Sequence, residues 1–427
     1  MKKYFFNKLK KEELESLTKR PAIDIERVFG IVKPVLDDIK TTGLKAALKY
    51  AEKFDGFDGD SIRVDDEEYL EAEWNLNPEV KTALESAAKN IETFHLKQKP
   101  SGYEIETVPG VKCSREYRAI ESVGLYVPGG SAVLPSTMLM LGIPAKIAGC
   151  GRVIVCSPAK NGKINYPLLY AAKLCGVNEF YKIGGAQAVG LMAYGDTSIP
   201  RVNKIFGPGN QYVTAAKLLV SIDAGGCAID MPAGPSEVLV IADKNANASF
   251  VASDLLSQAE HGADSQVVLV TDSENSAKNI SAEVEKQLEL LPRKEYAAKA
   301  LGNSFILITE NINQAIEFSN KYAPEHLIIN VEHPDKLKSK IINAGSVFLG
   351  QYSPESAGDY ASGTNHSLPT YGYAKTFGGV TVESFMKTMT FQNLSKEGLK
   401  NISDTVQRLA EVEELEAHKN AISIRLK

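Results

Sequence analysis

The stretch that decides the fold class is VLVIADKNANASFVASDLLSQAEHGADSQVVLVT, residues 238–271. Two short apolar runs, 238–242 and 267–271, lie on either side of a helix-like segment at 248–258. Short runs rich in Val and Ile are typical of buried strands, and alternation of strands with helices is typical of a parallel sheet. The stretch therefore predicts a strand–helix–strand unit.

The same rhythm extends over most of the chain. Further apolar runs recur between helix-like segments, at 123–127, 153–156, 180–183, 305–309 and 327–331. Residues 1–100 have helical spacing and few motifs, and helices are also expected at 383–389 and 400–416, where the strand pattern has ended. We therefore predict an α/β fold with largely parallel sheets, a helical N-terminal segment and a helical C-terminal tail.

Composition argues against several classes of protein. The 427 residues carry 48 basic and 53 acidic side chains, a net charge of −5, with no basic block, so no nucleic-acid partner is expected. No apolar run approaches the roughly 18 residues that span a membrane, so no membrane partner is expected. Charges interrupt the apolar residues at the N-terminus, unlike a secretory signal peptide, and the five cysteines form no C-x-x-C pair. These features favour a cytoplasmic protein of two or more domains.

A candidate metal site lies at the end of the helix in the opening stretch. Gln258 and His261 are three residues apart, so they share one face of a helix that Gly262 is expected to end. The C-terminal end of a helix carries partial negative charge and attracts cations. Asp359, in the glycine-framed loop 358–366, can add an oxygen ligand. Mixed nitrogen and oxygen ligands fit zinc or a harder divalent ion.

Glu325 and His326 are the expected proton-transfer pair. They follow Ala323 and Pro324, where a helix is expected to give way to a strand. Histidine titrates near neutral pH, and a neighbouring carboxylate with a different pKa suits a second proton transfer. We therefore expect the two residues to be catalytic.

Glycine-rich turns mark places where a ligand can approach the backbone. Tyr126 begins a turn that runs to Ser131, and Gln187 and Asn210 each stand where an apolar run gives way to a helix, whose N-terminal amides bind anions. Ser236 lies in a similar turn. The alternative for each of these features is a plain turn or helix cap, and the first lacks the G-x-G-x-x-G spacing of dinucleotide-binding turns.

The tail contains a further acidic residue and histidine, Glu413 and His418. On a continuous helix, five residues place two side chains roughly 140° apart, at about 100° per residue. A straight helix therefore cannot present both to one ion. Either the helix ends near Ala417, or the two residues flank a bound ligand, and a solvated acidic face is an alternative for Glu413 alone.

Together these motifs resemble the L-histidinol dehydrogenase family. The resemblance covers nearly the whole chain, in order, and the first hundred residues contribute least. It is carried by VGLYVPGGS (123–131), GGAQA (184–188), IFGPGN (205–210), AGPSE (233–237), DLLSQAEHG (254–262), APEHL (323–327), GDYASGTNH (358–366) and AHKNA (417–421).

The resemblance implies an enzyme that oxidises L-histidinol through L-histidinaldehyde to L-histidine, the final steps of histidine biosynthesis, with two NAD⁺ and one zinc ion per subunit. It implies two Rossmann-like parallel-sheet domains of the aldehyde-dehydrogenase type, and a homodimer whose tails are exchanged between subunits. The expected boundaries are an N-terminal helical segment 1–24, a discontinuous first domain 25–122 plus 238–380 with the metal and catalytic residues, a second domain 123–237 on the NAD side, and a helical tail 381–427.

The resemblance also implies roles for single residues. The implied metal ligands are Gln258, His261, Asp359 and His418, the last reaching the partner's site. The implied proton acceptors are Glu325 and His326, and the implied NAD contacts are Tyr126, Gln187 and Asn210. The implied substrate contacts are Ser236, Gln258, His261, His326, Asp359, Glu413 and His418.

Three other interpretations stay open. An NAD-dependent dehydrogenase of another small alcohol would use the same fold, although a tail that carries Glu413 and His418 favours histidinol. A zinc hydrolase needs the metal site but not the three glycine-rich turns. A non-catalytic binding protein has no use for Glu325 and His326 beside a metal.

Overall fold

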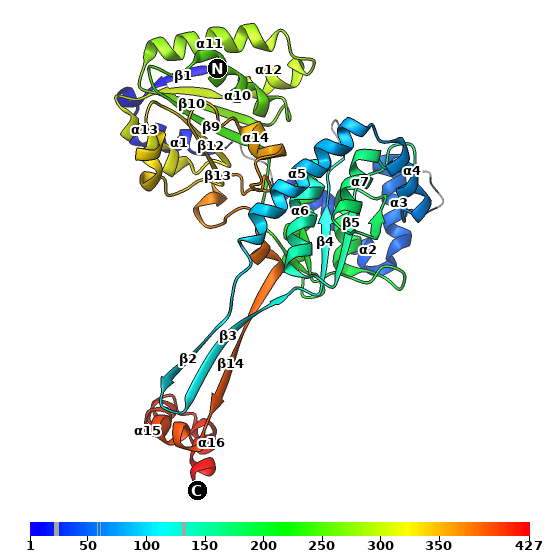
Figure 1. Cartoon of the computed structure of the whole chain (residues 1–427), viewed down its shortest axis with the longest axis vertical. Helices are drawn as coiled ribbons and strands as arrows, with labels where there is room; N and C mark the ends of the chain where they lie inside the picture. Colours follow the sequence, from blue (N-terminus) through cyan, green and yellow to red (C-terminus); the bar gives the residue numbers. More distant parts are fainter. Residues whose placement is uncertain (21–24, 58, 60, 130–133) are drawn as a thin grey trace.

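The computed structural model describes residues 1–20, 25–57, 59, 61–129 and 134–427. The chain forms two α/β units, each built on a parallel sheet, and an arm that projects away from both (Figure 1). The α/β fold with parallel sheets is therefore confirmed. Part of the turn predicted at 126–131 lies outside the described residues, from 130 onward.

The first unit is built on a six-stranded parallel sheet. In sheet order its strands are β1 (Lys2–Phe5), β11 (Phe305–Ile308), β10 (Gln266–Thr271), β9 (Glu237–Ala242), β12 (His326–Asn330) and β13 (Ser346–Leu349). Its helices are α1 (Lys11–Leu17), α10 (Ala248–Ala259), α11 (Glu274–Leu288), α12 (Lys294–Gly302), α13 (Ile312–Tyr322) and α14 (Glu355–Tyr360). Every residue of β9 and β10 is buried, which explains why continuous apolar runs encode them.

The opening stretch of sequence thus forms the predicted strand–helix–strand unit, β9–α10–β10, near the centre of this sheet. The N-terminal segment 1–24, expected to be helical, is helical only in part. It supplies α1, but its first residues form β1, which pairs in parallel with β11 at the sheet edge. An edge strand of four residues that is only half buried leaves little apolar pattern to predict it from.

The second unit contains a five-stranded parallel sheet. In sheet order its strands are β6 (Glu179–Tyr181), β5 (Arg152–Cys156), β4 (Ser122–Tyr126), β7 (Lys204–Phe206) and β8 (Ala228–Ile229). Helices α6 (Pro135–Ala148), α7 (Tyr166–Leu174), α8 (Gly185–Tyr194) and α9 (Gln211–Ile222) connect them. The strand order reverses at β4, and ligands of open α/β sheets bind at the carboxyl ends of strands at such a switch point.

The predicted boundaries need a correction in the N-terminal third of the chain. Residues 25–122 were expected to join the first domain, but their helices α2 (Ile25–Thr42), α3 (Leu44–Asp55), α4 (Asp66–Asn75) and α5 (Pro78–Leu96) pack on the second unit. Helix α2 contacts α8 and α9, α4 contacts α7, and α5 contacts α6. The apolar face of α2, with Val32 and Ile39, shares a buried core with Val189 and Val213. An amphipathic pattern predicts a buried face but not which sheet the face covers.

The arm is a three-stranded antiparallel sheet that ends in two helices. Its elements are β2 (Tyr103–Val108), β3 (Val111–Ala119), β14 (Met386–Leu394), α15 (Lys396–Val412) and α16 (Glu416–Leu426). The prediction of a helix at 383–389 is wrong, because these residues form part of a short 3-10 helix and the first half of β14. Pairing with β3, about 270 residues earlier in the chain, stabilises the strand, and local helical spacing cannot reveal such a partner.

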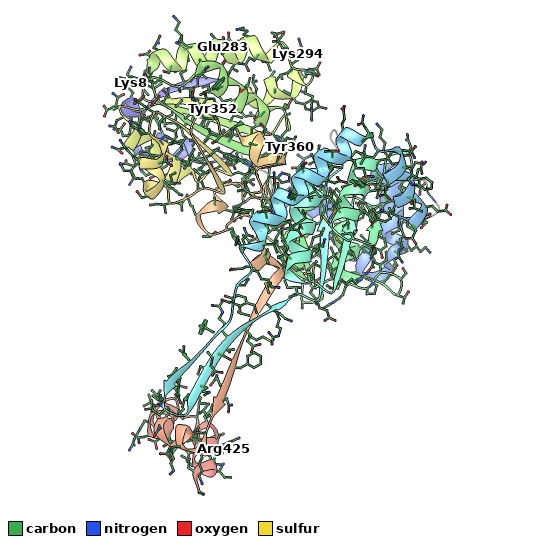
Figure 2. The ribbon with its side chains drawn as sticks, viewed as in Figure 1. Lys8, Glu283, Lys294, Tyr352, Tyr360 and Arg425 are labelled. Atoms are coloured by element: carbon green, nitrogen blue, oxygen red, sulfur yellow. The ribbon has the colours of Figure 1, made fainter. Side chains whose placement is uncertain are left out.

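No described helix combines the length and the apolar character that crossing a membrane requires. Figure 2 shows Tyr360, on α14, where the two units meet, and Arg425, on α16, at the far tip of the arm. Helices α14 and α16 therefore occupy very different places in the molecule.

Candidate active site

A cavity of about 290 Å³ lies between the two units and is lined by residues of both. Strands β9 and β12 pair in parallel, with His326 opposite Val238, so the residues that precede or begin these strands meet at one edge of the sheet. The cavity gathers a large part of the predicted site. The predicted residues that line it are Asn210, Ser236, Gln258, His261, Glu325, His326 and Asp359.

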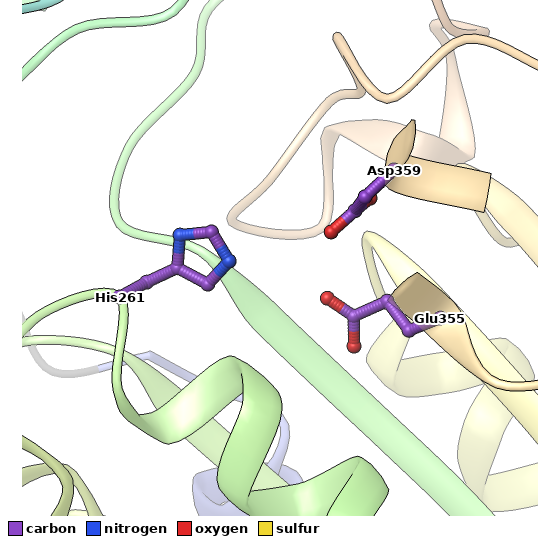
Figure 3. Close-up of side chains that lie close together, drawn as sticks. All are labelled: His261, Glu355 and Asp359. Carbon is purple, nitrogen blue, oxygen red and sulfur yellow. The ribbon is translucent and has the colours of Figure 1, made fainter. Parts of the chain in front are cut away.

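Two helix ends bring the predicted metal ligands together. Gln258 is buried on the last turn of α10, which ends at Ala259, and His261 follows just beyond the end of the helix. Asp359 comes from α14. One nitrogen of His261 and one oxygen of Asp359 lie within 4.8 Å of each other and of an oxygen of Glu355. Figure 3 shows these three side chains pointing toward a common spot.

Unpaired polar atoms surround that spot. Among the described residues, Gln258 Oε1, both carboxylate oxygens of Glu355 and His326 Nε2 are buried and have no hydrogen-bond partner. A buried polar atom without a partner costs about 1–3 kcal/mol, so a group of them signals a ligand that the protein is built to bind. Oxygen and nitrogen donors of this kind fit a divalent cation such as zinc.

Glu325 and His326 are held by the main chain of Glu237. The Glu237 N–H donates a hydrogen bond to Glu325 Oε2 over 2.8 Å, and the Glu237 carbonyl oxygen lies 3.2 Å from His326 Nδ1. An N–H at Nδ1 satisfies that carbonyl and leaves Nε2 as the basic nitrogen. Nε2 lies 3.7 Å from Asp359 Oδ1. The geometry thus presents an imidazole lone pair to the cluster of His261, Glu355 and Asp359.

Burial and charge shift the pKa values of this pair. Burial raises the pKa of Glu325 above its usual range. Burial lowers the pKa of His326, but the negative charges of Glu355, Glu325 and Asp359 outweigh that effect and raise it to about 10. A divalent cation among these carboxylates would offset their charge, so the pKa of the imidazole would fall toward the range in which it accepts protons.

The predicted NAD contacts have different surroundings. Asn210 caps α9 by accepting hydrogen bonds from the N–H groups of Tyr212 and Val213, and it lines the cavity. Tyr126 and Gln187 are buried outside the cavity lining. The Tyr126 hydroxyl accepts a hydrogen bond from the Gly185 N–H over 3.1 Å.

Gln187 is also engaged within the protein, because its amide nitrogen donates to Asp55 over 2.8 Å. Gly207 directly follows β7 and lies very close to the end of β4. A Cβ at this position would lie 2.0 Å from the Tyr126 carbonyl oxygen. These residues therefore shape the carboxyl ends of β4 and β7, where the switch point lies.

The tail residues are not brought to the cavity of their own chain. Glu413 and His418 are exposed at the end of the arm, which Figure 1 shows projecting away from both units. The straight helix that would have separated them is absent. Helix α15 ends at Val412, Glu414 has a left-handed φ of 57°, and α16 begins at Glu416.

The family follows from comparison with known proteins. The family model described as histidinol dehydrogenase matches residues 18–426. The chain belongs to the histidinol dehydrogenase family. It is therefore an oxidoreductase of histidine biosynthesis, with the dehydrogenase activity for which the family is named.

Relatives in the histidinol dehydrogenase family support this over the full length. The chain is 53% identical to the histidinol dehydrogenase of Vibrio parahaemolyticus, covering 100% of this chain and 98% of that one. It is 51% identical to the chloroplastic histidinol dehydrogenase of Arabidopsis thaliana, covering 100% of this chain and 92% of that one. It spans 51% of a putative bifunctional histidine biosynthesis protein of Photorhabdus laumondii, at 53% identity.

Solved structures agree with the fold. The crystal structure of the histidinol dehydrogenase of Elizabethkingia anophelis has a TM-score of 0.94 and 51% identity, and covers 100% of this chain and 98% of that one. An acetylating aldehyde dehydrogenase of Geobacillus thermoglucosidasius has a TM-score of 0.50 at 14% identity, and covers 89% of this chain and 93% of that one. The predicted aldehyde-dehydrogenase-like architecture is therefore confirmed.

For this member of the histidinol dehydrogenase family, sequence reasoning missed Glu355. Its side chain is 1% exposed, and its carboxylate joins His261 and Asp359. The available signal was its spacing, because Glu355 and Asp359 are four residues apart and share one face of α14. Sequence reasoning also missed His366, whose Nδ1 faces the Asp359 carbonyl and whose Nε2 faces the Thr137 hydroxyl, each at 3.0 Å.

Proposed function

We propose that the protein oxidises L-histidinol through L-histidinaldehyde to L-histidine at a zinc ion, and reduces two NAD⁺ for each histidinol. The observation that carries the proposal is the unpaired Nε2 of His326, buried beside the cluster of His261, Glu355 and Asp359. A proton acceptor next to a candidate cation site suits oxidation of an alcohol. The five-stranded parallel sheet borders the same cavity, and its switch point suits NAD⁺ as the hydride acceptor.

Gln258, His261 and Asp359 would hold the zinc ion, together with His418 of a second subunit. When bound, the ion would fix the imidazole and the amine of histidinol and so orient its carbinol. The orphaned Gln258 Oε1 supports this assignment, because the Gln258 amide nitrogen lies 3.5 Å from Glu325 Oε2 and turns the oxygen away from that carboxylate.

In the first oxidation, His326 Nε2 takes the hydroxyl proton while the carbinol carbon transfers hydride to NAD⁺, which gives the aldehyde. The Glu237 carbonyl holds the other imidazole nitrogen, so the ring keeps its orientation as it gains the proton. Ser236, which immediately precedes Glu237 and lines the cavity, contacts the substrate.

In the second oxidation, water adds to the aldehyde carbon. Glu325 takes a proton from this water, and its raised pKa suits a carboxylate that must hold a proton near neutral pH. His326, which must first release the proton of the first oxidation to solvent, then takes a hydroxyl proton of the hydrate as hydride passes to a second NAD⁺, which gives the carboxylate of histidine. Two neighbouring residues thus serve two successive proton transfers.

The dinucleotide would bind at the switch point of the five-stranded sheet. Asn210 is the contact best placed for it, because it lines the cavity at the N-terminus of α9. Tyr126 and Gln187 would act at the buried edge of the same site, where they set the position of the first turn of α8.

The working unit would be a homodimer with exchanged tails. The arm and its helices expose apolar side chains, among them Ile105, Phe391 and Val412, the last 82% exposed, which a partner would cover. Exchange would bring Glu413 and His418 to the partner's cavity, where Glu413 contacts substrate. We also propose a cytoplasmic location, in line with five cysteines that are all free.

NADH yield tests the proposed reaction. Zinc-loaded protein with limiting L-histidinol and excess NAD⁺ should form two NADH per histidinol, with histidine as the product. One NADH per histidinol would contradict the four-electron reaction. Oxidation of another small alcohol in preference to histidinol would favour the alternative, an NAD-dependent dehydrogenase that acts on that alcohol.

A further inference from the structure

The main chain of Glu237 sets the geometry of both catalytic side chains. Its N–H donates to Glu325 Oε2 over 2.8 Å, and its carbonyl oxygen faces His326 Nδ1 over 3.2 Å. A change in the backbone dihedrals of residue 237 would move its N–H and its carbonyl oxygen, which would loosen the carboxylate and free the imidazole to adopt the other tautomer. Whatever fixes residue 237 therefore fixes the reactive nitrogen of His326.

The side chain of Glu237 is locked by Arg20. The guanidinium donates from Nε to Oε1 over 3.1 Å and from Nη2 to Oε2 over 2.6 Å, a forked arrangement that fixes the carboxylate in its plane. The Tyr371 N–H donates to Glu237 Oε1 over 2.6 Å. The side chains of Arg20 and Glu237 are only 5% and 1% exposed. The pair is therefore fully enclosed by protein.

The same guanidinium holds the segment that leads into the catalytic pair. It donates to the carbonyl oxygens of Tyr322 over 2.6 Å and of Ala323 over 3.2 Å, and lies 3.5 Å from the centre of the Tyr322 ring. Ala323 has a left-handed φ of 53°, which is unfavourable for a residue with a Cβ, and it stands two residues before Glu325. Arg20 thus clamps the start of β9 and the approach to β12 at once.

A buried ion pair is a weak source of stability, because desolvation of both charges offsets much of their attraction. Its forked geometry is instead suited to fixing position. Arg20 does not line the cavity, so it does not touch the substrate. It comes from the N-terminal segment, the part of the chain that showed least sign of function in the sequence.

We propose that Arg20 is a positioning residue for catalysis, which acts through Glu237 to hold Glu325 and His326 in their reactive orientation. The inference rests on the proposed function. Since a displacement of about 1 Å at a reacting group can cost on the order of 10²-fold in rate, loss of the clamp should lower kcat far more than it weakens binding of substrate or metal.

The test compares Arg20→Gln and Arg20→Lys with a matched control, Arg152→Gln. Arg152 makes the same forked pair with Glu179, over 2.8 and 2.7 Å, and bonds to a carbonyl, but it lies in the second unit away from the cavity. For each zinc-loaded protein, kcat and KM are measured separately from L-histidinol and from L-histidinaldehyde, together with zinc content and the thermal midpoint of unfolding.

We expect Arg20→Gln to lose on the order of 10²-fold in kcat with both substrates, with KM and zinc content within about twofold of the unchanged protein. Arg20→Lys keeps the charge and the fold but loses the fork, and should recover only part of kcat. Arg152→Gln should lower the thermal midpoint and leave kcat unchanged.

Two results would overturn the inference. One is unchanged kcat in Arg20→Lys, which tests the clamp even if Arg20→Gln does not fold. The other is an equal loss of kcat in Arg152→Gln, which would show a general effect of stability. Failure of the unchanged protein to reduce NAD⁺ with histidinol is a distinct outcome, and would refute the proposed function and this inference with it.

Discussion

The cavity residues and the tail residues of the candidate site differ in how the chain holds them. Gln258, Glu325 and His326 are buried on elements that pack within one sheet unit, and their mutual distances are fixed by that unit. Glu413 and His418 are exposed at the end of an arm that leaves both units (Figure 1). The first group is preassembled by folding, whereas on our proposal the second group reaches a cavity only in a dimer.

The difference explains why one chain presents so many unpaired polar atoms. The first unit places Gln258 Oε1 and the Glu355 carboxylate around a single spot without completing their hydrogen bonds. On our proposal, zinc and the tail of a second subunit supply the partners that this group of atoms lacks. Folding and assembly would therefore contribute separate halves of one site.

The largest effect should come from removing His261, a proposed metal ligand in the preassembled group of cavity residues. We expect His261→Ala to lose zinc and, with it, nearly all histidinol oxidation, because His261 supplies the imidazole in the cluster with Glu355 and Asp359. Zinc content of the purified variant is the measurement. His333→Ala, which removes an exposed histidine outside the cavity lining, is the control and should keep its zinc. Full zinc content in His261→Ala would contradict the assignment.

Removal of the proton acceptor, His326, should leave zinc binding intact. His326→Ala is expected to lose about 10²–10⁴-fold in turnover, the usual contribution of a general acid–base group. The loss should appear in both half-reactions, since the imidazole serves both. Turnover from histidinol and from histidinaldehyde is measured separately on zinc-loaded protein. A variant that keeps either half-reaction at the original rate would refute the role in that step.

Glu325→Gln should separate the two oxidations. The amide still accepts from the Glu237 N–H but cannot take a proton from water, so aldehyde oxidation should fall by about 10²-fold while alcohol oxidation falls less. The measured quantity is the ratio of the two rates. Equal losses in both steps would show that the carboxylate does not act on water.

The smallest effect is expected at Glu355, one of the residues that sequence reasoning missed. Glu355→Gln preserves the shape of the side chain and removes one negative charge beside His261 and Asp359. Zinc affinity should fall by roughly 10–100-fold, as for other polar neighbours of metal ligands. Competition with a chelator of known affinity measures it. An unchanged zinc affinity would show that the charge of Glu355 does not contribute to binding of the ion.

The sequence predicted those parts of the fold that local patterns determine. Fully buried strands such as β9 and β10 leave continuous apolar runs, and the helix between them carries Gln258, as predicted. That helix ends at Ala259 and not at Gly262, so His261 lies just beyond it. The arm strands β2, β3 and β14 were not predicted. Their partners are remote in the chain and much of their surface is exposed, so neither apolar runs nor burial marks them.

Prediction of the site had a similar limit. Residues in dense polar motifs, such as Asp359 and His326, were found because the motif itself is unusual. Glu355 and Arg20 stand in unremarkable sequence, and only the folded chain brings them to the cluster and to Glu237. On our proposal, Glu413 and His418 reach a cavity only in a second copy of the chain, which the fold of one chain does not provide.

The central claim is that the tail of one subunit completes the cavity of another, and mixed dimers test it most directly. Subunits with His326→Ala and subunits with His418→Ala are inactive separately on our account. Coexpressed, they form dimers in which one of the two sites has an intact cavity and an intact exchanged tail. Random pairing should then restore about a quarter of the activity of the unchanged protein. Activity no greater than that of the separate variants would contradict the exchange.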